Sequence, residues 1–242
     1  MQGKSNNDHS LWATIQEGFV PVNRDGYKFI AIAAALMLLF WYVGFGWLAG
    51  LMLLAALYIA YFFRDPDRVT PLRTGLVIAP ADGRIIATTK VKPPLELGLG
   101  DAERVRISTF LSVLDVHVNR APVAGRISRS LYVPGAFVNA AADKASEENE
   151  RRALIIETPT GDEVAVVQIA GLIARRIVTF AGEGDTVAVG QRFGLIRFGS
   201  RVDVYLPVGK TPLVAIGQRT IAGETVLADL TSPEPPRDAR RG

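Results

Sequence analysis

The feature that most constrains this chain is an uncharged apolar run of 35 residues, from position 29 to position 63. One straight helix of that length would measure about 52 Å, far more than the roughly 30 Å hydrocarbon core of a bilayer. Glycines interrupt the middle of the run, at Gly44, Gly46 and Gly50. We therefore expect two short helices, residues 29–45 and 47–63, joined by a tight turn. Two arrangements remain open: a hairpin that crosses the membrane, and a re-entrant hairpin that enters one leaflet.

Basic residues flank the run on both sides: Arg24 and Lys28 before it, and Arg64, Arg68 and Arg73 after it. Positive charge at both ends predicts that both ends lie on the cytoplasmic side of a cell membrane. The run begins too late and is too long for a cleaved signal peptide. Residues 1–28 form a separate N-terminal segment, either an amphipathic piece at the membrane surface or a partly ordered tail.

Composition excludes several classes of function. The sequence has no cysteine, which rules out disulfides, thiolate metal sites and a cysteine nucleophile. Its formal net charge is only +3, and no central block of lysine and arginine indicates a nucleic-acid partner. The two histidines, His9 and His117, are too few for most histidine-rich metal centres, so we expect no metal.

After the apolar run the texture changes to short stretches rich in valine and isoleucine, separated by Gly, Pro and Asp turns. Such stretches are typical of β-strands. We expect strands at residues 77–79, 84–87, 105–110, 125–132, 153–157, 164–169, 177–180, 187–189 and 213–217, with two more inside 193–206. Helical pattern is thin; residues 140–149 are the best candidate and fit an ordered loop equally well. The fold class predicted is mainly β (α+β), a small antiparallel barrel- or sandwich-like domain behind a two-helix membrane hairpin.

Two turn phrases are near copies of each other, Pro80-Ala-Asp-Gly-Arg-Ile and Pro122-Val-Ala-Gly-Arg-Ile. A second, looser pair joins residues 183–191 to residues 221–228. Phrases of this kind are common in barrel-sandwich hybrid domains. They leave open a non-catalytic alternative, a membrane-anchored adaptor module. The last residues, 231–242, are rich in proline and arginine and indicate a disordered tail.

Within residues 193–206, a single Gly199-Ser200 pair separates two predicted strands. A Gly-Ser pair in that position is usually a turn. The alternative is that the backbone breaks here by its own chemistry, with Ser200 converted to a pyruvoyl group. Taken alone, the local sequence leaves both interpretations open.

Seven phrases in a fixed order bear on that choice. They are residues 62–68 (FFRDPDR), 79–83 (APADG), 110–122 (FLSVLDVHVNRAP), 132–140 (YVPGAFVNA), 149–151 (NER), 171–177 (GLIARRI) and 198–201 (FGSR). In these phrases the chain resembles the phosphatidylserine decarboxylases, in their short bacterial and archaeal form. The resemblance extends from the apolar run to about residue 230.

The resemblance implies that a catalytic domain, residues 64–230, cuts itself between Gly199 and Ser200. A β chain (1–199) and an α chain (200–242) would remain together as a heterodimer. Ser200 would become a covalent pyruvoyl group, which replaces pyridoxal phosphate, and no metal is implied. The enzyme would decarboxylate phosphatidylserine in the membrane to phosphatidylethanolamine. Another serine lipid, such as archaetidylserine, is an alternative substrate, and a homo-oligomer is possible.

Family roles attach to two further residues. Asp82 matches an acidic residue implicated in self-cleavage, although an Asp-Gly pair also forms turns by itself. His117 matches a histidine implicated in decarboxylation, and an ordinary histidine pKa near neutrality suits proton transfer. A structural histidine is the competing interpretation. Long members of the family carry a second histidine three positions later, where this chain has Arg120. An arginine cannot act as a base, so the activation of Ser200 remains open.

Two arginines, Arg175 and Arg176, lie in a matched phrase and are candidates for binding the anionic groups of the lipid. The alternative is that they form ion pairs with Glu183 or Asp185.

Overall fold

The computed structural model describes residues 20–135, 149–171, 176–197, 200–232, 234–237 and 239–240. The first 19 residues, most of the candidate helix at 140–149, Arg175 and Gly199 lie outside these ranges. The chain divides into two compact units, residues 1–67 and 68–242, which we describe separately.

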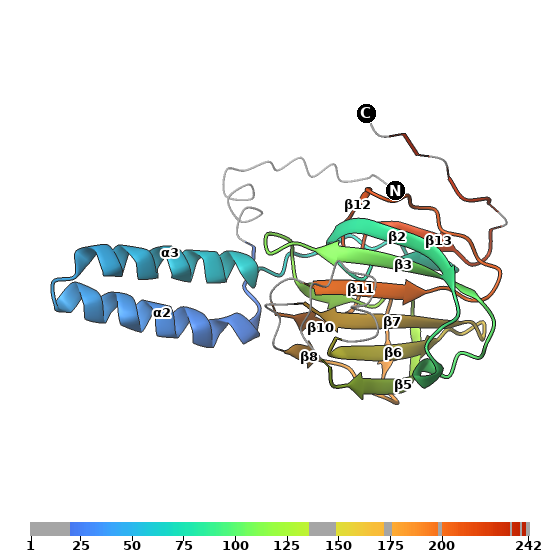
Figure 1. The fold of residues 1–242 in the computed structure, drawn as a ribbon, viewed down its shortest axis with the longest axis horizontal. Helices are drawn as coiled ribbons and strands as arrows, with labels where there is room; N and C mark the ends of the chain where they lie inside the picture. The colour runs from blue at the N-terminus through green and yellow to red at the C-terminus, as the bar shows by residue number, and fades with distance from the viewer. Residues whose placement is uncertain are drawn as a thin grey trace, which may run out of the picture. The chain divides into compact units, whose positions relative to one another are not determined.

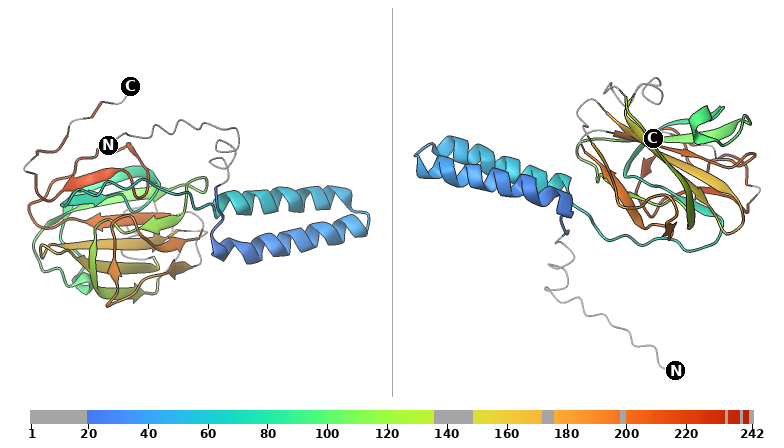
Figure 2. Two further views of the ribbon diagram at one scale, coloured as in Figure 1. Left: turned by 180° about the vertical axis from the view of Figure 1, so that it is seen from behind. Right: turned by 90° about the horizontal axis from the view of Figure 1, so that it is seen from below.

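The first unit contains two helices that lie side by side, α2 (Arg24–Tyr42) and α3 (Gly46–Phe62) (Figures 1 and 2). The hairpin was expected, but α2 begins five residues before the predicted position 29. Asn23 caps the helix there, since its side chain accepts a hydrogen bond of 3.2 Å from the backbone N–H of Asp25. Gly44, with a φ of 84°, then supplies the left-handed conformation that the connecting turn requires.

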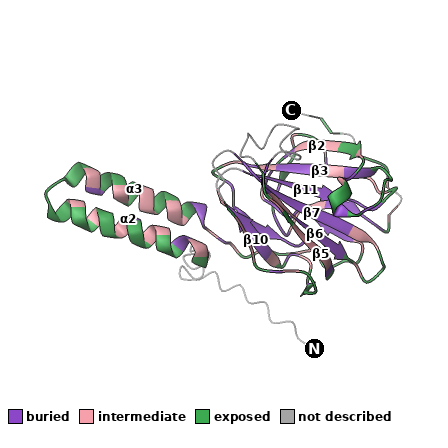
Figure 3. Cartoon of the chain, turned by 60° about the horizontal axis from the view of Figure 1, so that its bottom comes forward, coloured by how far each residue is buried: buried purple, intermediate pink, exposed green. Residues whose placement is uncertain are grey.

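The outer surface of this hairpin is apolar. Leu38 is 62% exposed, Trp47 72% and Leu54 65%, and exposed residues recur along both helices in Figure 3. Over its 19 residues, α2 is long and apolar enough to cross a membrane, whereas α3 has 17 residues. A surface of this kind does not suit contact with water.

The second unit is built from strands that pair only in antiparallel fashion in the described ranges. Their bounds are β1 (Leu76–Ile78), β2 (Gly83–Val91), β3 (Arg104–Leu111), β4 (Val118–Arg120), β5 (Gly125–Val133), β6 (Arg151–Glu157), β7 (Glu163–Ala170), β8 (Ile177–Thr179), β9 (Thr186–Val187), β10 (Arg192–Ile196), β11 (Ser200–Tyr205), β12 (Arg219–Thr220) and β13 (Val226–Asp229). One short 3-10 helix, η1 (Leu95–Leu97), follows β2. The predicted class, mainly β with an N-terminal helical hairpin, is confirmed.

Three sheets make up this unit (Figure 1). The largest is a curled sheet of eight strands in the order β12-β2-β3-β11-β7-β6-β5-β9. A three-stranded sheet, β4-β10-β8, and a two-stranded sheet, β1-β13, complete it. In the eight-stranded sheet β11 is an interior strand, paired on one side with β3 and on the other with β7.

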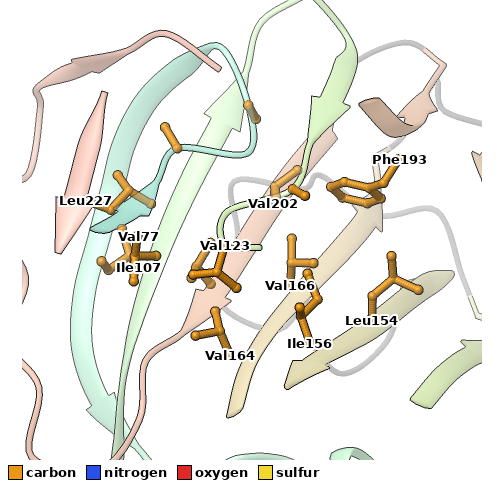
Figure 4. Packing of buried hydrophobic residues seen from close by; sticks show 14 of the residues in the cluster. Val77, Ile107, Val123, Leu154, Ile156, Val164, Val166, Phe193, Val202 and Leu227 are labelled. Atoms are coloured by element: carbon orange, nitrogen blue, oxygen red, sulfur yellow. The ribbon is translucent and has the colours of Figure 1, made fainter. Parts of the chain in front are cut away.

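The main hydrophobic core fills the concave side of the large sheet. There Val202 of β11 and Val166 of β7 pack in one cluster with Phe193 of β10 (Figure 4). A smaller cluster on the opposite face joins Tyr205 and Val167 to Leu97 of η1. Side chains along β11 therefore alternate between two buried environments, which explains why the whole strand is buried.

The two near-copied phrases become two equivalent strands. Each opens a nine-residue strand, β2 or β5, at Gly83 or Gly125. A Cβ atom at either glycine would approach a carbonyl oxygen of the neighbouring strand to 2.1 Å, that of Phe110 or that of Glu157. Both positions therefore require glycine, and the sequence repeat reflects a structural repeat.

One strand prediction is wrong. Residues 213–217 do not form a strand; Leu213 and Val214 are buried, but Gly217, with a φ of 91°, turns the chain. A buried apolar stretch reads as a strand even when a turn supplies its burial.

Candidate active site

Ser200 is the first residue of β11, opposite Leu111 of β3 and Ala170 of β7. It is 0% exposed. Its Oγ is buried and has no hydrogen-bond partner among the described residues. A buried hydroxyl without a partner costs free energy, so its position calls for an explanation other than stability.

The next residue along the strand, Arg201, points to the opposite face. Its Nε donates to Asp203 at 2.6 Å, and one terminal nitrogen donates to the other carboxylate oxygen of Asp203 and to Ser108 Oγ, both at 2.9 Å. Both side chains are 1% exposed. This pair fixes the register of β11, and it therefore directs Ser200 to the same face as Val202, towards the main core.

His117 lies just before β4 and is 2% exposed. Its carbonyl oxygen accepts a 3.3 Å hydrogen bond from the N–H of Ile196, at the end of the strand that leads towards Ser200. Its Nδ1 lies 2.9 Å from the carbonyl oxygen of Asp115. Because a carbonyl oxygen can only accept, Nδ1 carries a proton, and Nε2 is the basic atom of the neutral ring.

Asp82 lies in the turn before β2, and two groups hold its carboxylate. One terminal nitrogen of Arg68 donates to its two oxygens at 3.0 and 2.8 Å, and the N–H of Ala222 donates at 2.8 Å. The carboxylate therefore caps a distant segment and not its own turn. Burial raises the pKa of Asp82 above its ordinary 3.8, although Ala222 and Arg68 oppose the rise; the charge of Asp115 raises it further.

These contacts connect two of the predicted residues without reaching the third. Asp82 senses the charge of Asp115, whose carbonyl oxygen binds the ring of His117. The carboxylate of Asp115 is itself held by Arg219 at 2.6 Å. Neither Asp82 nor His117 is hydrogen-bonded to the Oγ of Ser200 in the described part of the chain.

Arg120 occupies the position of the missing second histidine and is 7% exposed. Its side chain donates to the carbonyl oxygen of Gly190 at 3.1 Å, and its backbone N–H donates to that of Pro80 at 2.9 Å. Arg120 therefore joins three segments of the domain, a structural function that suits an arginine.

Of the two candidate anion-binding arginines, only Arg176 is described. It is exposed, and with Arg152 it lines an open hollow of about 480 Å³ beside β8. Glu183 and Asp185 instead accept hydrogen bonds from the backbone N–H groups of Ser130 and Gly182, at 3.3 and 2.8 Å. Among the described residues neither carboxylate pairs with Arg176.

Comparison with known proteins identifies the family. Residues 55–228 match the family described as "Phosphatidylserine decarboxylase". The chain belongs to the phosphatidylserine decarboxylase family.

Three relatives, each named "Phosphatidylserine decarboxylase proenzyme", share this membership. The protein of Xanthobacter autotrophicus is 57% identical over 96% of this chain and 99% of its own length. That of Azorhizobium caulinodans is 59% identical over 95% and 97%, and that of Nitrobacter winogradskyi 59% identical over 86% and 84%. The chain is thus a decarboxylase, and the non-catalytic adaptor is ruled out.

A member of the phosphatidylserine decarboxylase family is expected to carry a pyruvoyl group made from its own serine. Ser200 fits that expectation, because its Oγ is the buried hydroxyl without a partner. Within the described ranges, no three His, Cys, Asp or Glu side chains are grouped so as to hold a metal ion.

Two residues of this site were not found from the sequence, Asn119 of β4 and Gln168 of β7. Both are 0% exposed, and Gln168 Nε2 donates to Asn119 Oδ1 at 2.7 Å. The available signal was a glutamine inside the otherwise apolar strand 163–170. A polar side chain at such a position has to find a partner inside the protein.

Proposed function

We propose that this protein decarboxylates phosphatidylserine to phosphatidylethanolamine after cutting its own backbone between Gly199 and Ser200. The observation that supports the proposal most directly is the buried, unpartnered Oγ of Ser200 at the start of β11. Family membership supports the substrate, and the word proenzyme in the relatives' names supports a precursor that is processed.

Self-cleavage begins when Ser200 Oγ adds to the carbonyl carbon of Gly199. The C–N bond breaks, the hydroxyl proton moves to the nitrogen of residue 200, and an ester replaces the amide. Loss of the Cα proton of residue 200 then expels Gly199 as a carboxylate and leaves dehydroalanine. Its imine tautomer reacts with water, releases ammonia and becomes the pyruvoyl group.

The sheet supports retention of the smaller fragment after cleavage. In residues 200–242, β11 is paired on both sides, with β3 and β7, and β13 is paired with β1. These partners all belong to residues 1–199. The two fragments therefore remain one folded heterodimer held by sheet hydrogen bonds and by the shared core.

When present, the pyruvoyl group offers the substrate amine an electrophilic ketone and draws electrons from the bond to the carboxylate through its adjacent carbonyl. His117 acts beside it as the proton donor. Asp115 holds the Nδ1 proton of the ring, so Nε2 is the atom that carries and delivers a proton to the substrate Cα after carbon dioxide leaves. We assign Arg176 to the anionic groups of the lipid, since its side chain is exposed beside an open hollow. Arg175 shares this assignment from the sequence.

A membrane location follows from the apolar hairpin, whose helix α2 meets the length needed to span. The basic flanks of the hairpin place the catalytic domain on the cytoplasmic face.

The experiment is intact-mass analysis and a denaturing gel of the full-length protein purified from membranes. The wild type is expected to give two fragments split at 199/200, the smaller one blocked at its N-terminus, and Ser200→Ala is expected to remain uncut and inactive. A single intact wild-type chain, fully folded, would refute the proposal. Incubation with phosphatidylserine or archaetidylserine, followed by product analysis, separates the two substrates.

His117→Ala tests the second stage. We expect carbon dioxide release to fall by about 10²- to 10⁴-fold, the usual contribution of a positioned acid or base. Whether this variant still cuts itself shows if one histidine serves both stages. Decarboxylation at the wild-type rate in a cleaved variant would contradict the assignment.

A further inference from the structure

The pair formed by Asn119 and Gln168 is wholly buried and only half satisfied. The two amides share one hydrogen bond, of 2.7 Å. Asn119 Nδ2 and Gln168 Oε1 are buried and have no partner in the described ranges. Rotating both amides by 180° exchanges their roles, but one NH₂ group and one carbonyl oxygen are left over in either arrangement. Burial without a partner costs about 1–3 kcal/mol per group, so stability does not explain the pair.

The sheet register places this pair beside Ser200. Gln168 lies opposite Val202, and Ala170 lies opposite Ser200, so Gln168 and Ser200 are diagonal neighbours on one face. Such neighbours are about 7–8 Å apart between Cα atoms, within reach of a long side chain. Asn119 approaches from the facing three-stranded sheet, where it pairs with Gly194. A Cβ at Gly194 would lie 3.1 Å from Gln168 Nε2, so the glycine leaves room for the amide.

The proposed cleavage needs a hydrogen-bond donor at this place. Addition of Ser200 Oγ to the carbonyl carbon of residue 199 puts negative charge on the former carbonyl oxygen, and a preorganised N–H stabilises such charge. Residue 199 is bonded directly to Ser200, so the charge develops next to the serine. Other buried donors lie elsewhere: Arg106, for instance, is opposite Tyr205 and lies 4.0 Å from Asp203, on the other face.

We propose that the Asn119–Gln168 pair is the oxyanion-stabilising donor of self-cleavage, with Asn119 Nδ2 as the donating atom. This inference rests on the proposed function. A neutral amide suits the task because it supplies a donor without an additional charge to bury. The hydrogen bond from Gln168 holds the Asn119 side chain in one orientation, so the donor is in place before the reaction begins.

The test compares cleavage with folding in the same protein. Full-length chains are made by cell-free translation with phospholipid vesicles, and conversion of the 26.2 kDa precursor to two fragments is followed with time. The double variant Asn119→Leu/Gln168→Leu removes both amides. Its cleavage should be slower by about 10²- to 10³-fold, the usual effect of losing one such donor. Its melting temperature in a Ser200→Ala background should not fall, since two apolar groups replace two half-satisfied amides.

Ser108→Ala is the matched control. Ser108 is also 0% exposed and on the same sheet, but it binds Arg201 on the opposite face. It should cut at the wild-type rate. Cleavage of the double variant within twofold of the wild type would overturn the inference while leaving the proposed function intact. A wild-type precursor that never splits would instead refute the proposed function.

Asn119→Asp decides the case in which the double variant fails to fold. The aspartate still accepts from Gln168 but, once ionised, has no N–H or O–H to donate; a protonated carboxyl regains a donor. Cleavage of this variant should therefore be slow at neutral pH and should recover relative to the wild type as the pH falls. A constant ratio to the wild type across the pH range, or wild-type speed at neutral pH, contradicts the inference.

Discussion

At the scale of single residues, Asp82 is held by groups from two distant parts of the chain. Arg68 lies 14 positions before it, and Ala222 lies 140 positions after it. The side chains of Arg68 and Asp82 are only 13% and 15% exposed. Arg68 appeared in the sequence as one of the basic flanks of the hairpin, but in the structure it is the counter-ion of a site carboxylate.

Replacing that counter-ion should make stability more sensitive to pH. Arg68→Met leaves Asp82 buried without its cation, so the unfolding free energy should fall by about 3 kcal/mol at neutral pH. The pKa of Asp82 is already raised above 3.8 by burial, and loss of Arg68 raises it further. A raised carboxyl pKa contributes stability at low pH that is lost as the pH rises through the folded-state pKa. The deficit should therefore shrink under acidic conditions, measured by urea unfolding of the Ser200→Ala protein in detergent.

Arg73→Met is the control, because Arg73 pairs with Asp229 away from the site. Burial works against ionisation of Asp229, but hydrogen bonds from Arg73 and Thr231 hold its pKa at about 2. Its contribution to stability is complete above the ordinary pKa of 3.8 and is lost only as the pH falls towards 2. The deficit of Arg73→Met should thus stay constant or shrink only at the acid extreme. An Arg68→Met deficit that grows on mild acidification would contradict the account of Asp82.

At the scale of elements, the large sheet repeats a strand unit. β2 and β5 each have nine residues, each has an irregularity after its third residue, and each is paired on its outer side with a two-residue strand, β12 or β9. Asp82 belongs to one unit, and Ala124 occupies the equivalent position in the other. One copy therefore carries a site carboxylate where the other carries a methyl group.

The two leading glycines separate folding from function. Gly83→Ala and Gly125→Ala should each destabilise the domain by several kcal/mol, since either Cβ would lie 2.1 Å from a carbonyl oxygen. Gly83→Ala should also impair cleavage in the molecules that fold, because it displaces Asp82. Thermal unfolding and cleavage rates of the two variants provide the measurement. Gly182→Ala, with no atom within 4 Å of the new Cβ, is the control that should behave as the wild type. Equal cleavage by the folded fractions of both variants would show that Asp82 is not needed there.

Much of this fold was predictable because the long strands carry their own pattern: β2, β3, β5, β6 and β7 were all expected from runs rich in valine and isoleucine. β4 and β12 have three and two residues, too few to show a period, and exist because longer neighbours offer them hydrogen bonds. For the site, motifs led to Ser200, His117 and Asp82. Asn119 and Gln168 come together only when two sheets face each other, which no local stretch encodes.

At the scale of the whole molecule, the chain joins a hairpin with an apolar exterior to a domain with a buried apolar core. The exposed face of Leu38 is suited to lipid, and that of Leu72, which is 80% exposed in the second unit, to water. Leu38→Arg should weaken membrane retention, because a charged side chain near the centre of a spanning helix costs about 2.5–3.5 kcal/mol. Leu72→Arg should not. The fraction of full-length protein that remains in the membrane pellet after an alkaline wash is the measurement, and equal retention of both variants would contradict the assignment of the hairpin.

The interior position of β11 has a consequence for the life of the enzyme. A dissociable cofactor that is damaged can be exchanged for a fresh one. On the proposed function, the reactive group here is the end of a polypeptide strand clamped between β3 and β7, and it is made once, from a serine that is then gone. A molecule whose pyruvoyl group is reduced or modified has no route to repair. The cell has to replace it by new synthesis, so the working lifetime of the protein is set by the chemical durability of one residue.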